Sequence, residues 1–243
     1  MDQQQMAANM LSLHTPPESN PKNTERLFKI LVIGDPGTGK SSIIRQFVHN
    51  TYMQYYKATV GVDFATKIVA NDDGSILRLQ LWDVSGQDRF SNLTRVYFKD
   101  AHGAIVVCDC ERKDTTEGAL RWKADLDAKL RLADGGTIPT LFVHNKCDLN
   151  PDLNEEKINE KAQSEGFHGG KICSAKENIG VKDVFNVLSS LIVRTDNAGL
   201  YEIPIYLRDG NTHRLAELNN VSGQNDNSKE KKPKSAFKIL CCQ

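Results

Sequence analysis

The residues from Gly34 to Ser41 read GDPGTGKS, and their types and spacing suit a loop that holds phosphate. The glycines allow successive backbone N–H groups to turn towards one anion, at a helix N-terminus that already favours negative charge. Lys40 is placed to reach β- and γ-phosphate oxygens, and the hydroxyl of Ser41 is a suitable ligand for Mg²⁺. An apolar run ends at Ile33 and a helical pattern begins at Ser42, so we predict a nucleotide site rather than a chance glycine turn.

A second polar segment, WDVSGQ, ends another apolar run at residues 82–87. Asp83 is suited to hold Mg²⁺ through water, and the N–H of Gly86 to meet a γ-phosphate. Gln87 is suited to orient an attacking water molecule. The segment therefore predicts chemistry at the terminal phosphate of the nucleotide.

Two further segments predict the base that is bound. In the segment NKCD, residues 145–148, the carboxylate of Asp148 can accept hydrogen bonds from N1–H and the exocyclic amine of guanine. Adenine offers no such pair of donors, which argues against an ATP-using enzyme such as a small-molecule kinase. The segment SAK, residues 174–176, follows the last apolar run and is placed to close over the base.

Short apolar runs alternate with helical patterns from Leu27 to about Thr195. This alternation predicts an α/β domain with a mostly parallel sheet, helices on both faces and right-handed crossovers. The predicted strands are 28–33, 62–69, 76–82, 104–108, 140–144 and 171–173, with a hairpin around residues 71–74. The predicted helices are 42–48, 116–132, 155–165 and 181–194. Ligands of such sheets bind at the carboxyl ends of the strands, where the polar segments lie.

Composition and charge limit the classes of protein to which this chain can belong. The chain has 243 residues and a formal net charge of zero, so bulk charge gives no argument for nucleic-acid binding. Residues 1–24 are rich in Gln, Asn, Pro and Ser and are predicted to be disordered, without a secretory signal or a myristoylation site. No apolar run is long enough to span a bilayer, and the spacing of four cysteines fits no zinc pattern. We expect those four to be buried structural thiols: Cys108, Cys110, Cys147 and Cys173.

Residues 196–243 are predicted to form a flexible tail. The apolar segment 200–207 has no functional interpretation; it either packs back on the domain or serves as a docking motif. A lysine-rich cluster spans residues 229–238, and the chain ends in Cys241, Cys242 and Gln243. Lipid chains on both cysteines would supply the two signals that stable anchoring needs, with the lysines adding attraction to an anionic membrane.

The motifs GDPGTGKSS, ATVGVDF, LQLWDVSGQDRF, RVYFKDA, HNKCD and CSAK resemble those of small GTPases of the Ras superfamily, and within it the Rab family, over residues 27–195. The resemblance implies a six-stranded sheet with one antiparallel edge strand, and two switch segments that order around GTP and Mg²⁺ and relax after hydrolysis. The cysteine pair resembles the doubly prenylated ending of Rab proteins. The three implied parts are a disordered extension, 1–24, a GTP-binding domain, 25–195, and the tail, 196–243.

The resemblance also implies a role for each matching residue. The residues implied to bind GTP or GDP are Gly34, Pro36, Gly37, Thr38, Gly39, Lys40, Ser41, Ser42, Tyr52, Thr59, Gly86, Asn145, Lys146, Asp148, Ser174, Ala175 and Lys176. Mg²⁺ is implied to be held by Ser41, Thr59 and Asp83, and the catalytic residue is Gln87. The effector-facing aromatic residues are Phe64, Trp82 and Tyr97, although Phe64 suits a core position equally well. The lipidated residues are Cys241 and Cys242.

Two departures from the family pattern lie near the γ-phosphate. Pro36 lacks an N–H and has a fixed φ, and Ser85 adds a hydroxyl where alanine is usual. They predict slow hydrolysis by a molecular switch, with a GTP-binding scaffold of negligible hydrolysis as the alternative. No arginine finger is evident in the chain, so an activating protein is expected to supply one.

The resemblance implies further partners: an exchange factor, Rab effectors, an escort protein and a dissociation inhibitor, around a monomeric GTP-binding domain. The sequence segments LFKILVIGD, GVDFATK, NLTRVYFKDA and LRWKADLDAK are most similar to those of the Rab subgroup that serves lysosome-related organelles such as melanosomes and gut granules. The expected location is the cytoplasmic face of such a membrane or of lysosomes, with a cytosolic pool. The organelle and the individual regulators are not predicted by the sequence.

Overall fold

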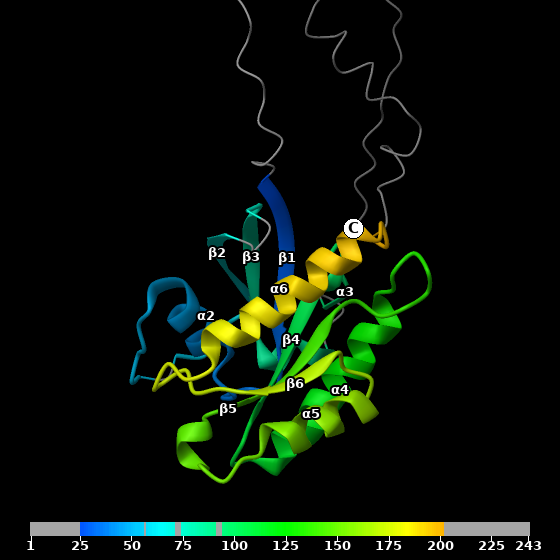
Figure 1. The fold of residues 1–243 in the computed structure, drawn as a ribbon. Helices are drawn as coiled ribbons and strands as arrows, with labels where there is room; N and C mark the ends of the chain where they lie inside the picture. The colour runs from blue at the N-terminus through cyan, green and yellow to red at the C-terminus, as the bar shows by residue number, and fades with distance from the viewer. Residues whose placement is uncertain (1–24, 56, 71–73, 91–93, 202–243) are drawn as a thin grey trace, which may run out of the picture. The chain divides into compact units, whose positions relative to one another are not determined.

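The computed structural model describes residues 25–55, 57–70, 74–90 and 94–201, and Figure 1 shows the fold that they form. The predictions for residues 1–24, for the turn at 71–73 and for the tail from residue 202 onward lie outside the described residues. These include the predictions for the lysine-rich cluster and for Cys241 and Cys242. Within the part of the chain that is described, no helix has the length and apolar character needed to cross a membrane.

Six strands form one sheet in the order β2-β3-β1-β4-β5-β6. Their bounds are Glu25–Ile33 (β1), Val62–Ala70 (β2), Ile76–Val84 (β3), Gly103–Asp109 (β4), Thr140–Asn145 (β5) and Gly169–Ile172 (β6). β2 pairs with β3 in antiparallel fashion, and all other neighbours are parallel. The structure therefore confirms the predicted α/β fold, its hairpin and its one antiparallel edge strand.

The two central strands carry uninterrupted apolar runs because helices cover both faces of the sheet. Residues 30–33 of β1 have no exposed surface, and β4 is buried along its whole length. Runs of Val, Ile and Leu without polar alternation are typical of parallel strands that are buried on both sides. β1 and β4 thus fix the frame from which the loops of the site extend.

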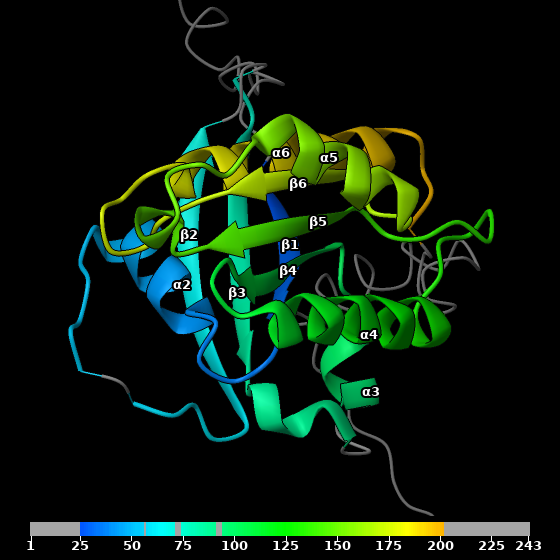
Figure 2. The same cartoon turned by 90° about the horizontal axis from the view of Figure 1, so that it is seen from below.

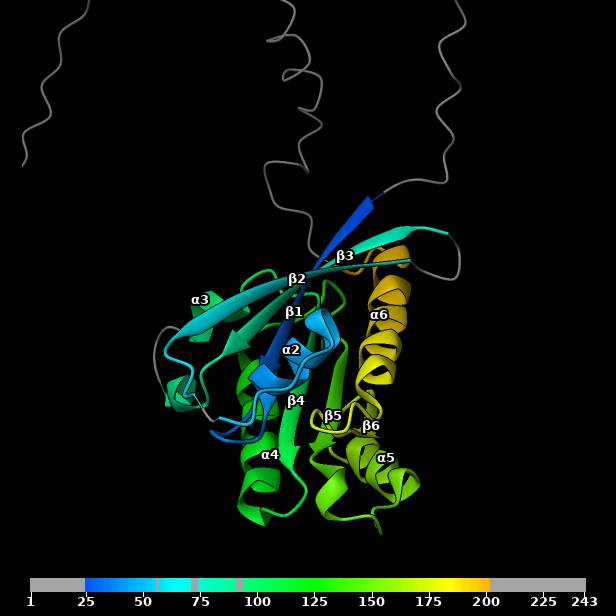
Figure 3. The ribbon, with the colours of Figure 1, turned by 90° about the vertical axis from the view of Figure 1, so that its left-hand side faces the viewer.

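The helices are Lys40–His49 (α2), Thr94–Phe98 (α3), Lys113–Lys129 (α4), Glu155–Ser164 (α5) and Val181–Asn197 (α6), with short 3-10 turns at Gly86–Phe90 (η1) and Cys147–Leu149 (η2). α2 and α6 pack on one face of the sheet, and α3 and α4 pack on the other face. Figures 2 and 3 show α4 and α6 on opposite sides of the strands. α5 contacts the edge strand β6.

α4 begins three residues earlier than predicted, because the Thr115 side chain completes its first turn. The Thr115 hydroxyl accepts a hydrogen bond from the N–H of Asp109 (2.9 Å) and donates one to the carbonyl of Arg112 (2.6 Å). α3, η1 and η2 were not predicted, since elements of three to five residues are too short to show a period. These differences leave the positions of the four polar segments unchanged.

The start of the apolar segment 200–207 packs back on the domain. The carbonyl of Leu200 accepts from the N–H of Ala133 (2.9 Å), and the Tyr201 hydroxyl donates to the carbonyl of His102 (2.7 Å). For these two residues the structure supports packing over docking, while residues 202–207 lie outside the described part. α6 also continues to Asn197, two residues beyond the predicted end of the domain.

The expectation that all four cysteines are buried is only half right. Cys108 and Cys173 are buried, and burial raises the pKa of both thiols, that of Cys108 to about 12. Cys110 and Cys147 are only half-buried. Cys110 directly follows the last residue of β4, and Cys147 lies two residues after the end of β5, where the chain enters the loops of the site.

Candidate nucleotide site

The loop from Gly34 to Gly39 joins β1 to α2, and its backbone requires glycine. Gly34, Gly37 and Gly39 have φ values of 142°, 78° and 91°. A Cβ at position 34 would lie 2.2 Å from the carbonyl oxygen of Val107, and one at position 39 would lie 2.3 Å from Nδ2 of Asn145. No side chain among the described residues caps the first turn of α2, so its N–H groups remain available to an anion.

Lys40 lies buried at the centre of this loop. Its Nζ donates to the carbonyls of Gly34 (2.9 Å) and Asp35 (3.0 Å). Burial lowers the pKa of Lys40 to about 8, although the charges of Asp83 and Asp35 act in the opposite direction. The ammonium group is therefore fixed where the loop curls around it, as phosphate coordination requires.

Three hydroxyl and carboxylate groups from separate segments converge beside Lys40. Ser41 Oγ donates to Asp83 Oδ2 (2.5 Å), and Thr59 Oγ1 lies 3.0 Å from Ser41 Oγ and 3.3 Å from Asp83 Oδ2. The second oxygen of Asp83, Oδ1, is buried and has no partner among the described groups. Burial raises the pKa of Asp83, opposed by its bonds to Ser41 and Thr59 and by Lys40. Hard oxygen ligands around an unpaired carboxylate oxygen fit Mg²⁺.

The segment after β3 lies directly against the phosphate loop. A Cβ at Gly86 would lie 2.4 Å from the Pro36 nitrogen and 2.8 Å from the Gly34 carbonyl oxygen. Ser85 is buried, and its hydroxyl accepts from the N–H of Gln87 (3.4 Å), while the Gln87 side chain is exposed. The described contact of the Ser85 hydroxyl is thus with the backbone of the predicted catalytic residue.

A cavity of about 240 Å³ lies between the loops that follow β1, β5 and β6. Its lining residues are Gly39, Ser42, Tyr52, Asn145, Lys146, Asp148, Leu149, Ala175 and Lys176. Eight of the nine are predicted binding residues, and Leu149 is the addition. The structure therefore brings the predicted base-binding segments together in one hollow.

Hydrogen bonds hold the loops around this cavity in register. Asn145 Nδ2 donates to the Thr38 carbonyl (2.8 Å), and its Oδ1 accepts from the N–H of Ala175 (3.1 Å). Asp148 Oδ1 accepts from the Ser174 hydroxyl (2.5 Å), and its Oδ2 lies 3.8 Å from the Lys176 Nζ. Asn145 thus ties the phosphate loop to the base loops, and the Ser174 hydroxyl orients the carboxylate.

Sequence reasoning missed Asp109 at the end of β4. Its Oδ2 accepts from the Nζ of Lys146 (2.7 Å), a residue with a left-handed φ of 68°. Asp109 is buried, so the pair fixes the Lys146 stem beside the cavity. A carboxylate directly after a buried strand was the signal that could have found it.

The predicted aromatic trio clusters at the β2 edge of the sheet. The rings of Phe64 and Trp82 meet edge to face at 4.6 Å, and Tyr97 is half-buried nearby, with its hydroxyl 4.0 Å from the position of a Cβ on Gly61. Phe64 is 58% exposed, so the alternative of a core position for it is wrong. The effector role of these residues remains a prediction.

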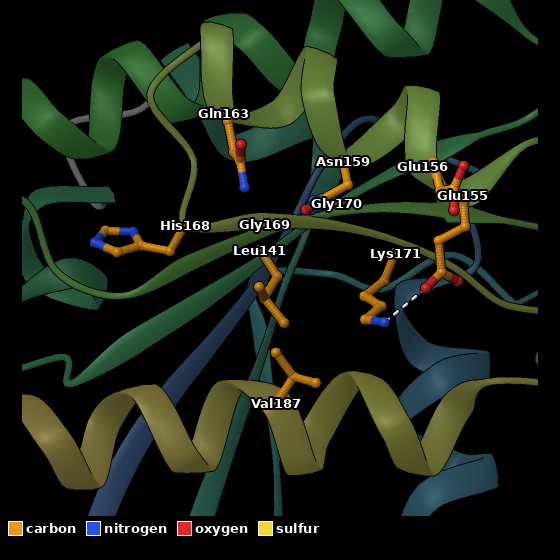
Figure 4. Close-up of a pocket in the computed structure, with 10 residues that line it drawn as sticks. All are labelled: Leu141, Glu155, Glu156, Asn159, Gln163, His168, Gly169, Gly170, Lys171 and Val187. Atoms are coloured by element: carbon orange, nitrogen blue, oxygen red, sulfur yellow. Dashed lines mark hydrogen bonds and ion pairs between the residues drawn. The ribbon is translucent and has the colours of Figure 1, made fainter.

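A larger cavity, about 360 Å³, lies between α5, β6 and α6 (Figure 4). Two pairs of its polar groups bond to one another: Lys171 Nζ donates to Glu155 Oε1 (2.6 Å), and the Gly170 N–H donates to Asn159 Oδ1 (2.9 Å). The second bond satisfies one backbone N–H at the open edge of β6. None of the predicted nucleotide residues is among its described lining, so it is not the cavity that the sequence predicts for a nucleotide.

Comparison with known proteins agrees with this geometry. The sequence profile of the Ras family matches residues 29–194. Human Ras-related protein Rab-32 is 46% identical over 175 residues, which cover 71% of this chain and 78% of that protein. Rab-32A of Dictyostelium discoideum is 45% identical over 176 residues, 71% of this chain and 80% of that protein. Human Ras-related protein Rab-7L1 is 38% identical over 180 residues, which cover 74% of this chain and 89% of that protein.

The family match decides between the functional alternatives. Members of the family bind guanine nucleotides and hydrolyse GTP to GDP, so neither a scaffold of negligible hydrolysis nor an ATP-using enzyme is favoured. Rab proteins are switches in membrane trafficking that act on intracellular membranes through regulators and effectors. The chain belongs to the Ras family of small GTPases and is a Rab protein related to the Rab-32 group.

Proposed function

We propose that this Rab protein binds GTP and GDP with Mg²⁺ through the residues that converge at the carboxyl edge of its sheet, and that it switches on a lysosome-related membrane. The observation that carries the proposal is the meeting of Ser41, Thr59 and Asp83 beside the buried Lys40. The cavity beside Asp148 supports the placement of guanine at the other end of the same site. One continuous site thus has places for base, phosphates and metal.

Hydrolysis would be in-line attack of water on the γ-phosphate. Gln87, which is exposed at the start of η1, orients the water, and Lys40 neutralises charge that develops on the phosphate oxygens. The uncapped N–H groups at the start of α2 preorganise the phosphates. Ser41, Thr59 and Asp83 would hold Mg²⁺, which supplies further charge neutralisation when bound.

Nucleotide competition on the purified full chain tests this function. We expect GTP and GDP, but not ATP, to displace a labelled GDP, because only guanine offers the paired donors that Asp148 accepts. The same sample should convert GTP to GDP in single-turnover assays, slowly in the absence of an activating protein. Equal displacement by ATP, or no displacement by GTP, would contradict the proposal.

The proposed partners follow from family membership. An exchange factor, an activating protein that supplies an arginine, an escort protein and a dissociation inhibitor would regulate a monomeric domain, and no role in nucleic-acid binding is proposed. Effectors would contact the cluster of Phe64, Trp82 and Tyr97, whose exposed ring is Phe64. The similarity to Rab-32 proteins supports a lysosome-related organelle or lysosome as the site of action.

The proposed anchor is a pair of prenyl groups on Cys241 and Cys242. Replacing both cysteines by serine should move the protein from membranes to the cytosol, because stable anchoring needs two lipid signals. Nucleotide affinity should stay unchanged. Fractionation and imaging of a tagged full chain measure the first result, and nucleotide binding by the same variant controls for folding. Unchanged membrane association would remove the lipid hypothesis.

A further inference from the structure

Asp35 places a carboxylate inside a loop that is built to receive anions. Two charges of the same sign repel each other, and they repel more strongly in a partly buried site than in bulk water. The structure resolves this conflict by turning the side chain away from the loop. Asp35 Oδ1 accepts from Nε1 of Trp122 on α4 (3.2 Å), and Oδ2 lies 3.9 Å from Nη2 of Arg121.

α4 is shaped to receive this carboxylate. Trp122 is fully buried, and its indole N–H has one described acceptor, Asp35. Gly118 lies one turn earlier on the same helix, and a Cβ there would be 1.8 Å from Asp35 Oδ2. The carboxylate thus occupies space that only glycine leaves free. Glycine is disfavoured within helices, so Gly118 stands in α4 at some cost in helix propensity.

A second contact from the start of α4 holds the next residue of the loop. Arg112 Nη1 donates to the carbonyl of Pro36 (3.2 Å), and its Nη2 donates to Asp114 (2.9 Å). The same guanidinium lies 3.3 Å from the position of a Cβ on Gly37. Asp35 and Pro36 are therefore both attached to one helix, which lies beside the loop in Figure 2.

The held segment faces the part of the site that only a triphosphate uses. Gly86, whose N–H is proposed to meet the γ-phosphate, packs against Pro36. Lys40, which is proposed to bridge β- and γ-phosphates, donates to the Asp35 carbonyl (3.0 Å). Because Pro36 offers no N–H of its own, the remaining donors must be held in place by their surroundings.

We propose that Asp35 and Arg112 are positioning residues, through which α4 holds the Asp35–Pro36 segment in the conformation that binds the γ-phosphate. Trp122 and Gly118 form the receiving surface. The inference rests on the proposed nucleotide site and deepens it, because it assigns a device that favours GTP over GDP. Loosening the segment raises the ordering cost of binding GTP more than that of binding GDP.

Variants of the full chain test this inference by the ratio of GTP to GDP affinity. Asp35→Ala and Trp122→Phe each remove one side of the hydrogen bond, and we expect each to weaken GTP binding about tenfold and GDP binding much less. The two changes combined should cost no more than either alone, since both remove the same bond. Asp35→Asn keeps an acceptor for the indole N–H and should restore most of the ratio.

Gly118→Ala is the sharpest of these variants, because it removes no polar group. Alanine has a higher helix propensity than glycine, so a loss of GTP preference could not come from a weakened helix. The added methyl must displace the Asp35 carboxylate, and we expect the same fall in the ratio.

Arg112→Gln with Lys113→Gln as its matched control tests the second contact. Both remove one positive charge from neighbouring exposed positions, but of the two only Arg112 has a bond to the loop among the described contacts. We expect a lower ratio for Arg112→Gln alone. Suppose that the wild type binds both nucleotides, and that Asp35→Ala, Gly118→Ala and Arg112→Gln keep its ratio of GTP to GDP affinity. The positioning role would then be overturned while the proposed function stands. A wild-type chain that binds neither nucleotide would overturn both.

Discussion

Lys40→Met is expected to weaken GTP binding about a thousandfold, or ~4 kcal/mol. The Nζ of Lys40 is buried and is held by the carbonyls of Gly34 and Asp35, so in the proposed site it would meet the phosphates without having to be ordered first. Removing one partner of a buried, hydrogen-bonded charge pair costs about 2 to 5 kcal/mol, because the other charge is left unpaired. Methionine keeps most of the volume, so the change tests charge rather than packing.

The pH dependence of GTP binding provides a second signature of the same residue. Burial lowers the pKa of Lys40 to about 8 in the free protein, and bound phosphates favour the charged form. Above pH 8 the free protein must therefore take up a proton to bind, and affinity should fall by up to about tenfold per pH unit. The stability of the free protein changes with pH in the opposite direction. Between pH 8 and 10.5 Lys40 is protonated in the unfolded chain but not in the folded one, so the free energy of unfolding rises with pH there.

Titration calorimetry of wild type, Lys40→Met and Lys29→Met between pH 7 and 9 measures these effects. Lys29 is the matched control, because burial also lowers its pKa to about 8, while its Nζ donates to the Lys99 carbonyl (2.7 Å). Lys29→Met should bind GTP as tightly as the wild type, and its GTP affinity should fall with rising pH in the same way. If Lys40→Met binds GTP within a few-fold of wild type, the ammonium does not contact phosphate.

The strands and the phosphate loop could be predicted because local patterns encode them. The apolar run of β1 needs no partner to be recognised, and three loop glycines adopt positive φ values that other residues resist. The convergence of Ser41, Thr59 and Asp83 was predictable from the rule that ligands gather at the carboxyl ends of strands, once the resemblance had supplied Thr59.

What escaped prediction depends on contacts between distant residues. Asp35 and Trp122 are 87 positions apart, and nothing in either segment shows that they bond. The pair of Asp109 and Lys146 was missed for the same reason. Cys110 and Cys147 sit beside apolar runs yet remain half-exposed, because burial ends where the strands end, and composition does not locate that boundary.

Asp148→Asn is expected to lower affinity for GTP by about a thousandfold or more, and to raise affinity for xanthosine triphosphate. A site built to hydrogen-bond particular groups rejects an analogue that lacks them by about 10⁴-fold in favourable cases, since buried polar groups are then left unpaired. In the proposed site the carboxylate of Asp148 accepts from both N1–H and the exocyclic amine of guanine. An amide accepts from N1–H and donates instead, which matches the carbonyl that xanthine carries in place of the amine.

The surroundings of Asp148 determine how cleanly this exchange works. The Ser174 hydroxyl donates to Asp148 Oδ1 (2.5 Å), and an amide oxygen in that place can accept the same bond. That bond would direct the new NH₂ group towards the base. Ser174→Ala should therefore weaken GTP binding in the wild-type background and reduce the xanthine gain in the Asp148→Asn background.

Competition with GTP, xanthosine triphosphate and ATP measures the outcome for each variant. Asp152→Asn makes the same chemical change on an exposed turn nearby and should leave all three affinities unaltered. If Asp148→Asn kept GTP affinity within a few-fold and gained nothing for xanthine, the base would not lie against this carboxylate. The cavity beside Tyr52 and Lys176 would then have to hold another part of the nucleotide, because its lining would no longer explain the preference for guanine.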